Sequence, residues 1–595
     1  MYTRQSDRPA INASYLHPGQ RVRIWYAALV AVMLLFGVRL FYLQIIRHDH
    51  YKKAALTGQL KQYEVPAERG VIEAQDGDRV VPLVLNEKRY TLFADPKFIQ
   101  NVDKATVAVQ GAIGGDAAKY REAMRQDTRY AILAKKLTKE QKDKLDSLKI
   151  KGLGTRENSQ RTYPQGDLAA QLLGFVDDEG RGKYGLEQAM NSELSGKPGQ
   201  LRAITDASGV PLVANTDNVV ISPKSGERLS LTINVSMQRQ LEDILKSGLE
   251  KAQSKSGSAL VLDPNTGAIK AMANFPTYNP AEFYKVEDGA VFNNASVSAP
   301  LEVGSIMKPL TAAAALNLGV VNKNTTYQDA SRIKIGDATI TNIEEDGGPG
   351  VRSVADILQL SLNTGAVYLL QQMGGGEINQ KARLAWHDYM VNHYKLGKTT
   401  GIEQGYEATG SIPDPTDGFG LNIQYANTAF GQGMSATPLQ MGMALASVIN
   451  GGKYYKPHLI DRVTQSDGKI VKKSPIVVKA DVLSPSVSSD MVDLLENVVS
   501  KNYILYGLPK LNPAYRIGGK TGTAQITKPG GGYYDDRYNG TFMGFVGGDK
   551  PEYVIVVRVN EPKIGGYAGS KAAAPIFTSL VTMLINNFGV TPKGQ

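Results

Sequence analysis

The longest apolar stretch of the chain is 24–46, in which only Arg39 and Gln44 are strongly polar. As a helix it would be roughly 34 Å long at about 1.5 Å per residue, which is enough to cross the hydrocarbon layer of a membrane. An arginine at the centre of a bilayer costs about 2.5–3.5 kcal/mol, but Arg39 lies in the last third, where its side chain can reach the headgroups. The pattern therefore predicts a membrane anchor over 24–46.

Two alternatives to the anchor stay open, a cleaved signal peptide and a buried core helix. No small-x-small cleavage site follows the stretch, which favours an uncleaved anchor. Basic residues flank it on both sides in nearly equal number, so charge alone does not set its orientation. The simplest arrangement is a cytoplasmic tail over 1–23, the anchor, and the rest of the chain outside the cytoplasm.

The segment 48–228 has the pattern of a mixed, strand-rich domain without obvious chemistry. Residues 89–96 alternate like a strand that a proline stops. Thr138 and Gln141 have the spacing of a capping box at the start of a short charged helix. The polar, turn-rich stretch 215–228 predicts a domain boundary.

A second pattern begins at 229 and runs to 595. Ser236 is a candidate N-cap for a helix whose apolar residues, Leu241 and Leu245 among them, recur at helical spacing. The runs 258–263 and 268–275 flank a short turn and predict two hairpin strands. Further helices and a strand-rich end follow. The fold class predicted for this part is α+β, in layers of sheet and helix.

The amino-acid composition limits the kinds of binding and catalysis that this chain can carry out. The 595 residues suggest about three folding units, and the net charge of +10 favours anionic surroundings. No run of basic residues interleaved with aromatics supports nucleic-acid binding. There are no cysteines, and the six histidines have no HExxH spacing, so thiol chemistry is excluded and a zinc hydrolase is disfavoured. No GxSxG elbow is present, so a nucleophile must find a base other than histidine.

Three short motifs carry candidate chemistry, and the first is Ser305-x-x-Lys308. Three residues apart on a helix, the amine can approach the hydroxyl and act as its base. The same spacing occurs at Ser331 and at Ser466, the latter around an Asp-Gly that predicts a hairpin tip. Ser305 differs because Gly304 precedes it and an apolar helix follows. This context places it at a helix start, where the dipole favours negative charge.

The second motif is Ser361-x-Asn363, expected on a loop between two helices. The hydroxyl can relay a proton and the amide can hold a substrate carbonyl, although simple capping of a helix starting near Thr364 explains the same residues. The third motif is Lys520-Thr521-Gly522, in a glycine-flanked strand. A strand that carries Lys and Thr outward, with a glycine that permits close approach, suits a carboxylate.

Taken together, the order and spacing of the three motifs resemble the serine β-lactamases and penicillin-binding proteins. The surrounding sequence narrows the resemblance to class B penicillin-binding proteins, single-span peptidoglycan transpeptidases. The segments that carry it are 161–200, 259–280, 429–459 and the GGKTGTAQI run. Three details depart from the family pattern: EVGS before the serine, SLN in the second motif, and a loose match at 69–78.

The resemblance implies a role for each motif residue. Ser305 would be the acylated nucleophile and Lys308 its base, with Ser361 and Asn363 as proton relay and substrate-amide contact. Lys520, Thr521, Gly522 and Thr523 would bind the substrate, Lys520 and Thr521 through its terminal carboxylate. The backbone N–H groups of Ser305 and Thr523 would form the oxyanion hole. No metal or cofactor is implied.

The resemblance also implies a function and a setting. A pedestal over 48–228 would carry a transpeptidase domain over 229–595, with an antiparallel sheet flanked by helices and an all-helical subdomain. The substrate would be the D-Ala-D-Ala end of peptidoglycan stem peptides, with β-lactams as inhibitors. Expected partners are a polytopic glycosyltransferase and proteins of the division or elongation complex, at a bacterial plasma (inner) membrane. The compact pedestal favours division over elongation. A D,D-carboxypeptidase, a β-lactamase and a catalytically silent scaffold or β-lactam receptor remain alternatives.

Overall fold

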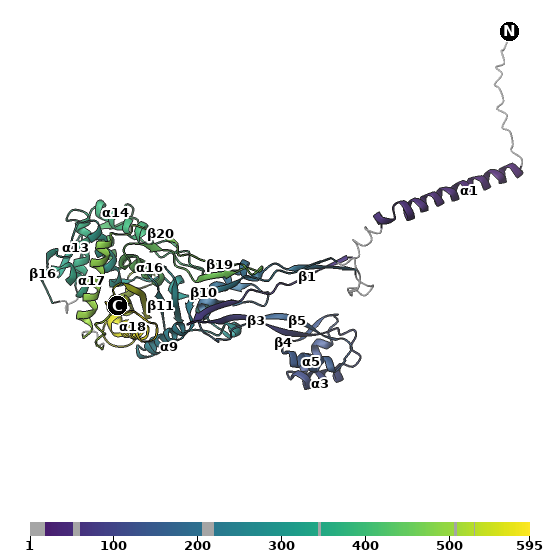
Figure 1. Cartoon of the computed structure of the whole chain (residues 1–595), viewed down its shortest axis with the longest axis horizontal. Helices are drawn as coiled ribbons and strands as arrows, with labels where there is room; N and C mark the ends of the chain where they lie inside the picture. Colours follow the sequence, from purple (N-terminus) through teal and green to yellow (C-terminus); the bar gives the residue numbers. More distant parts are fainter. Residues whose placement is uncertain are drawn as a thin grey trace, which may run out of the picture. The chain divides into compact units, whose positions relative to one another are not determined.

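The computed structural model describes residues 18–51, 60–204, 219–342, 347–504, 509–528 and 530–594. Contacts divide the chain into two compact units. The first unit consists of 1–67 and 197–224, and the second of 68–196 and 225–595. Figure 1 labels the elements of both.

The first unit contains the apolar helix predicted from the sequence. Helix α1 spans Pro18–Phe41 and continues as a π-helical turn, η1, over Tyr42–Ile46. Residues Val22–Ile46 are long and apolar enough to cross a membrane, and none of that stretch is buried against protein. Of the predicted tail, 1–17 lie outside the described residues, whereas 18–23 already belong to α1. The same unit holds a three-stranded antiparallel sheet of β1 (Leu60–Val65), β8 (Gly199–Ile204) and β9 (Val219–Ile221), in the order β1-β8-β9.

A seven-stranded sheet runs through the second unit in the order β19-β18-β10-β2-β3-β4, with β5 on the other edge of β3. Its neighbours pair antiparallel except β10 and β2, which are parallel. The strands are β2 (Ile72–Asp76), β3 (Arg79–Ala94), β4 (Ala131–Leu137), β5 (Leu153–Thr162), β10 (Arg228–Asn234), β18 (Ile460–Thr464) and β19 (Ile470–Lys472).

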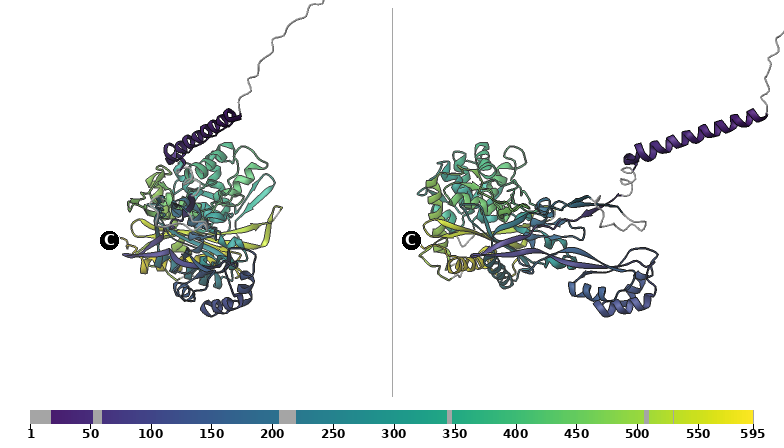
Figure 2. Two further views of the ribbon diagram at one scale, coloured as in Figure 1. Left: turned by 90° about the vertical axis from the view of Figure 1, so that its right-hand side faces the viewer. Right: turned by 45° about the vertical axis from the view of Figure 1, so that its right-hand side comes forward.

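Residues 85–162 form a small lobe at one end of this sheet, with a hydrophobic cluster of its own that includes Leu92, Val109 and Leu145. Its helices are α3 (Val102–Ile113), α4 (Ala117–Met124) and α5 (Lys139–Ser147). Both ribbon views place these helices on one side of β3–β5 (Figures 1 and 2). The predicted capping box forms at the start of α5, where Thr138 and Gln141 bond reciprocally.

The second sheet of this unit is five-stranded, antiparallel and ordered β12-β11-β23-β22-β21. It contains the predicted hairpin, and helices cover both of its faces. Its strands are β11 (Ser256–Leu262), β12 (Ile269–Phe275), β21 (Arg516–Thr527), β22 (Tyr533–Gly547) and β23 (Pro551–Asn560).

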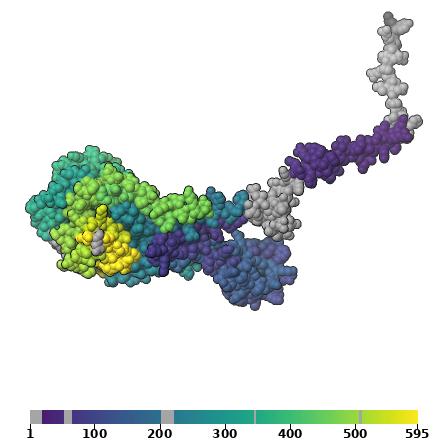
Figure 3. Space-filling view, in the orientation of Figure 1, coloured from purple at the N-terminus to yellow at the C-terminus, as the bar shows by residue number. Residues whose placement is uncertain are grey.

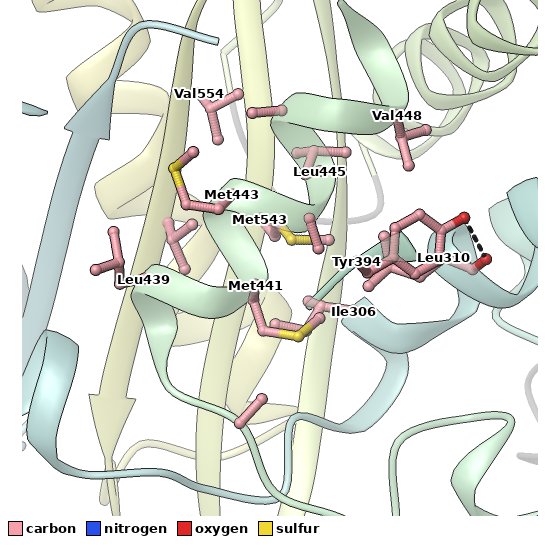
Figure 4. Packing of buried hydrophobic residues seen from close by; sticks show 14 of the residues in the cluster. Ile306, Leu310, Tyr394, Leu439, Met441, Met443, Leu445, Val448, Met543 and Val554 are labelled. Carbon is pink, nitrogen blue, oxygen red and sulfur yellow. Dashed lines mark hydrogen bonds between the residues drawn. The ribbon is translucent and has the colours of Figure 1, made fainter. Parts of the chain in front are cut away.

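On one face of this sheet, α9 (Val235–Lys251) and α18 (Ala574–Asn587) bury Leu241, Leu245 and Leu580 against alternate residues such as Ile555. On the other face, α16 (Pro438–Ile449) inserts Leu439, Met441 and Met443 against Val554 and Met543 (Figure 4). Because successive side chains of a strand point to opposite faces of the sheet, each strand contributes apolar residues to both cores. This sandwich of helix, sheet and helix confirms the α+β prediction.

The prediction that Ser236 is the N-cap of this helix is wrong. Asn234 is the N-cap of α9 and accepts a hydrogen bond from the Met237 backbone N–H, so Ser236 lies inside the first turn. Asparagine and serine cap equally well, and the choice falls to Asn234 because β10 ends there in extended conformation.

The remaining elements of the second unit are mostly helical. The helices are α6 (Ala170–Leu173), α7 (Gly185–Ala189), α8 (Asn191–Ser195), α10 (Ala295–Ser298), α11 (Lys308–Asn317), α12 (Val354–Gln359), α13 (Asn363–Met373), α14 (Gln380–Asp388), α15 (Leu421–Thr428) and α17 (Pro485–Asn502). The short helical turns are η2 (Pro280–Lys285), η3 (Gly289–Phe292), η4 (Gly304–Met307), η6 (Tyr389–His393) and η7 (Gly569–Ala573). Four strand pairs complete the fold: β6 (Phe175–Val176) with β7 (Gly182–Lys183), β13 (Thr326–Asp329) with β16 (Gly350–Ser353), β14 (Arg332–Ile335) with β15 (Ala338–Thr341), and β17 (Tyr454–Tyr455) with β20 (Val477–Lys479).

Candidate active site

Ser305 lies in the short turn η4, immediately before α11, as its sequence context predicts. Gly304 is required beside it for two reasons. Its φ is +61°, and a Cβ there would come within 2.9 Å of the Thr523 carbonyl oxygen on β21. The serine is therefore held at the contact between a buried helix start and an edge strand, and its side chain is half-buried.

Lys308 begins α11 and is completely buried. Its Nζ donates to the Ser361 hydroxyl at 3.1 Å, to Asn363 Oδ1 at 2.8 Å and, at short range, to the Ser361 carbonyl. All three acceptors are uncharged oxygens. The first two motifs therefore meet at a single amine.

Ser361 occupies the connection between α12 and α13 with a φ of +61°, an unusual conformation for serine. Asn363 is the first residue of α13, and its Nδ2 donates to the Thr341 carbonyl at 3.1 Å. Leu362 is the N-cap and supplies no side-chain cap. Capping, the simpler explanation for this motif, is therefore wrong, because the hydroxyl and the amide oxygen both face Lys308.

The third motif lies on β21, and it differs from the sequence expectation in one respect. Lys520 does not face outward: it is only 1% exposed, and its Nζ donates to the Thr521 carbonyl at 3.1 Å. Gly522 permits the close approach of β21 to η4, since a Cβ there would come within 2.8 Å of the Val303 carbonyl. The Thr523 hydroxyl accepts from the Gly569 backbone N–H at 3.0 Å, which fixes η7 against the strand.

These residues line one cleft of about 530 Å³ in the second unit. Ser305, Ser361, Asn363, Lys520, Thr521 and Thr523 are among the residues that form its walls. Lys308 and Gly522 lie behind these walls and hold the motifs in place. The fold thus brings together three segments that are more than 50 residues apart in sequence.

The cleft also contains residues that no sequence motif predicts. Gln359 and Asn502 form a reciprocal amide pair: Gln359 Nε2 donates to Asn502 Oδ1 at 3.0 Å, and Asn502 Nδ2 donates to the Gln359 carbonyl at 2.8 Å. Phe430 and Tyr567 contribute aromatic wall. No local pattern marks such residues, because their place depends on which helices meet.

Glu302, three residues before the serine, is half-buried and accepts from the Tyr533 hydroxyl at 3.0 Å and from the Gly433 backbone N–H at 3.1 Å. Burial raises the pKa of this carboxyl. The contact ties the segment before Ser305 to the start of β22.

The other two S-x-x-K matches lie elsewhere. Ser331 is in the turn between β13 and β14, and Ser466 is in the connection between β18 and β19, which confirms the hairpin prediction. Within the described ranges there is no group of three or more metal-ligating side chains.

Comparison with known proteins identifies the family of this chain. Residues 257–582 match the family described as "Penicillin binding protein transpeptidase domain", and 64–231 match "Penicillin-binding Protein dimerisation domain". The chain belongs to the class B penicillin-binding proteins.

Relatives of this penicillin-binding protein match it over most of their length. It is 30% identical to "Stage V sporulation protein D" of Bacillus subtilis, over 95% of this chain and 85% of that one. It is 27% identical to "Peptidoglycan D,D-transpeptidase FtsI" of Escherichia coli K12, over 95% and 91%. A crystal structure of penicillin binding protein 2X from Streptococcus thermophilus has the same fold, with a TM-score of 0.72 at 24% identity over 88% of this chain and 80% of that one.

Proposed function

We propose that this penicillin-binding protein is a peptidoglycan D,D-transpeptidase that works through an acyl-enzyme on Ser305. The observation that carries the proposal is the buried Lys308 amine, which contacts Ser361 and Asn363 behind the same cleft that Ser305 and Lys520 line. The transpeptidase family match and the names of the relatives support the reaction class.

In the first step Ser305 Oγ attacks the carbonyl of the penultimate D-Ala of a stem peptide. Lys308 takes the hydroxyl proton, since an amine among uncharged oxygens can act as a base. The peptide C–N bond breaks, and its nitrogen leaves with a proton relayed through Ser361, which releases the terminal D-Ala. In the second step the amine of a neighbouring strand attacks the ester, returns Ser305 as an alcohol and forms the cross-link.

Binding and charge stabilisation fall to the other motif residues. Lys520 and Thr521 hold the terminal carboxylate of the substrate, and Asn363 holds its amide. The backbone N–H groups of Ser305 and Thr523 bind the developing oxyanion, and one such donor contributes about 2.7–4 kcal/mol in comparable enzymes. The close packing of Gly304 and Gly522 across η4 and β21 supports this pairing of donors.

The setting is part of the proposal. The apolar helix anchors the chain in the plasma membrane with the catalytic domain outside the cytoplasm, above a pedestal over 48–228. A polytopic glycosyltransferase supplies the uncross-linked glycan strands. The FtsI relatives favour work at the division septum, among the proteins of the division complex.

The test is labelling of membranes with a fluorescent penicillin. Ser305→Ala should abolish the labelled band, while Ser331→Ala, the matched serine of a second S-x-x-K, should leave it intact. Persistent labelling of Ser305→Ala would place the nucleophile elsewhere.

A muropeptide assay with purified protein then separates the possible acceptors. Cross-linked dimers that depend on Ser305 are the expected product. Release of D-Ala without dimers would instead mean that water is the acceptor and that the enzyme is a carboxypeptidase.

A further inference from the structure

Helices α3–α5 cover one face of the sheet of the small lobe. Tyr90 and Leu92 of β3 pack into the core beneath α3–α5, while the alternate residues Arg89 and Thr91 face the other way. Directly opposite on β5 lie Asn158 and Arg156, and Asn158 Nδ2 donates to the Thr91 hydroxyl at 2.6 Å. The small lobe is the blue part of Figure 3.

The opposite face of the sheet lines a groove of about 370 Å³, closed at its far side by Pro280–Phe283 and by the Val176–Asp178 segment. Five basic side chains and two acidic ones line it. Apolar groups lie between the charges, among them Tyr130 and Ile132, which are 47% and 44% exposed, and Phe283. The groove therefore combines positive charge with apolar surface.

Two polar groups that line the groove are buried without a partner. Arg161 uses Nε for Glu187 and Nη1 for Asn86, both at 2.8 Å, but among the described residues its Nη2 has no hydrogen-bond acceptor. The Tyr163 hydroxyl likewise has no partner in the described part of the chain. Burial raises the pKa of Tyr163, so its hydroxyl stays a proton donor. A buried donor without an acceptor is costly, and oxygen atoms of a ligand would satisfy it.

The surface cations of the groove are also incompletely paired. Lys135 lies 3.9 Å from Asp178, but no carboxylate of the described residues lies within ion-pair distance of Lys136 or Arg156. The Lys136 amine instead lies 5.4 Å above the Tyr284 ring. The groove thus offers unpaired cations at its rim and unpaired donors at its base.

We propose that this groove binds an acidic peptide segment of a partner protein. Carboxylates of the peptide would bind Lys136, Arg156 and the buried donors of Arg161 and Tyr163, and its apolar side chains would pack on Tyr130, Ile132 and Phe283. The exposed apolar residues favour a peptide over a lone anion, because a phosphate or a sugar carboxylate leaves them in water. Arg161 remains tied to Glu187 and holds the base of the groove in place.

The experiment uses the full chain in zwitterionic nanodiscs and a fluorescent random copolymer of Glu and Tyr as the acidic polypeptide. Lys136→Glu with Arg156→Glu should weaken saturable binding about tenfold or more, because it reverses the complementary charge at the groove. Lys104→Glu with Lys119→Glu, an equal charge change on α3 and α4, is the control and should weaken binding less than about twofold. Fluorescent-penicillin labelling and thermal unfolding show that each variant is folded.

Tyr163→Phe tests the buried donor separately. It removes an unpaired hydroxyl, so the Tm of the free protein should stay unchanged or rise, while copolymer binding should weaken severalfold. A purely structural role for this hydroxyl predicts the reverse: a lower Tm with unchanged binding.

Several outcomes would overturn the proposal. The first is an equal loss of copolymer affinity in the two charge-reversed double variants. The others are the absence of saturable copolymer binding and full displacement of the copolymer by inorganic phosphate. Phosphatidylglycerol vesicles that bind in a groove-dependent manner while the copolymer does not would identify a lipid surface instead.

Discussion

Two buried charges of the second unit have opposite surroundings. Glu187, completely buried on α7, accepts from Arg69 Nε at 2.7 Å and from Arg161 Nε at 2.8 Å, both from side chains at most 10% exposed. Lys308, equally buried, directs its amine at the uncharged oxygens of Ser361 and Asn363. Glu187 is matched by two opposite charges, whereas the Lys308 amine donates hydrogen bonds to the neutral oxygens of Ser361 and Asn363.

The difference fits a structural role for Glu187 and the catalytic role proposed for Lys308. Buried charges of opposite sign hold distant segments together. Removing one partner leaves an unpaired charge in the protein interior, where it is poorly solvated. An amine among neutral oxygens keeps its uncharged form accessible and can exchange a proton with a neighbouring hydroxyl. In the proposed mechanism, the same fold therefore uses one buried charged group to hold segments together near the small lobe and another for chemistry in the cleft.

The largest expected effect comes from Lys308→Met. Without the amine, the rate of penicillin acylation should fall by about 10³–10⁴, in the range of a lost general base. Stopped-flow acylation of the purified chain measures it. Lys334→Met, the lysine of the Ser331 motif, is the matched control and should acylate normally. A normal rate in Lys308→Met would remove this lysine from the mechanism.

Glu187→Gln should lower the free energy of unfolding by about 3–5 kcal/mol, because two guanidinium groups lose their shared carboxylate. Denaturant titration in detergent measures the loss, and acylation of the folded fraction should be unchanged. Glu179→Gln breaks an exposed pair with Arg181 and should cost less than about 1 kcal/mol. Equal losses of unfolding free energy in the two variants would mean that the buried ion pairs of Glu187 stabilise the fold no more than an exposed pair does.

Asn363→Asp makes the cleft resemble the structural site by placing a carboxylate where an amide oxygen now lies 2.8 Å from the Lys308 amine. The new charge should hold the amine as an ammonium ion and slow acylation by about 100-fold. Because the ammonium form must lose its proton first, the rate should recover only at higher pH. A wild-type rate with an unshifted pH profile would contradict the assignment of Lys308 as base.

The smallest expected effect concerns Glu242 of α9, a largely buried carboxyl that accepts hydrogen bonds but forms no ion pair with any of the described residues. Burial raises the pKa of Glu242 to about 7, although the Ala169 backbone N–H and Gln238 donate to it. A carboxyl whose pKa is higher in the folded than in the unfolded state stabilises the fold at low pH. That contribution is lost as the pH rises from the unfolded value through about 7.

Glu242→Gln keeps the acceptor oxygen and removes the titration. Between about pH 5.5 and about pH 8, the wild type should lose about 2 kcal/mol more unfolding free energy than the variant. Denaturant titrations at the two pH values measure this difference. Parallel pH profiles would show that Glu242 does not titrate in this range.

Much of the fold followed from local pattern. The apolar stretch before residue 47, the capping box at Thr138 and the hairpin around residue 265 each depend on contacts within a few residues, so a short window of sequence contains the whole cause. The prediction of Ser236 as the N-cap was wrong because local sequence did not decide between two candidates. Two adequate caps lay two residues apart, and the end of β10, fixed by its sheet partners, decided between them.

The candidate site divides in the same way. Motif order and spacing suggested Ser305, Ser361 and Lys520, and the position of Ser305 at a helix start was predicted from Gly304 and the apolar helix that follows. The burial of Lys520 and the Gln359–Asn502 pair were not readable. They arise where η4, α12 and α17 meet β21, and local sequence does not encode which surfaces meet.

By itself, then, the sequence determined the reactive groups, the apolar helix and the local elements, because the identity of a side chain and its nearest neighbours set propensity, capping and chemical type. The tertiary structure decided that Glu187 lies between two guanidinium groups and that the Lys308 amine reaches Ser361 and Asn363. It also decided which face of the small lobe is covered and which is a basic groove. The reason is that desolvation and charge pairing depend on distances between segments far apart in the chain, and only the packed fold fixes those distances.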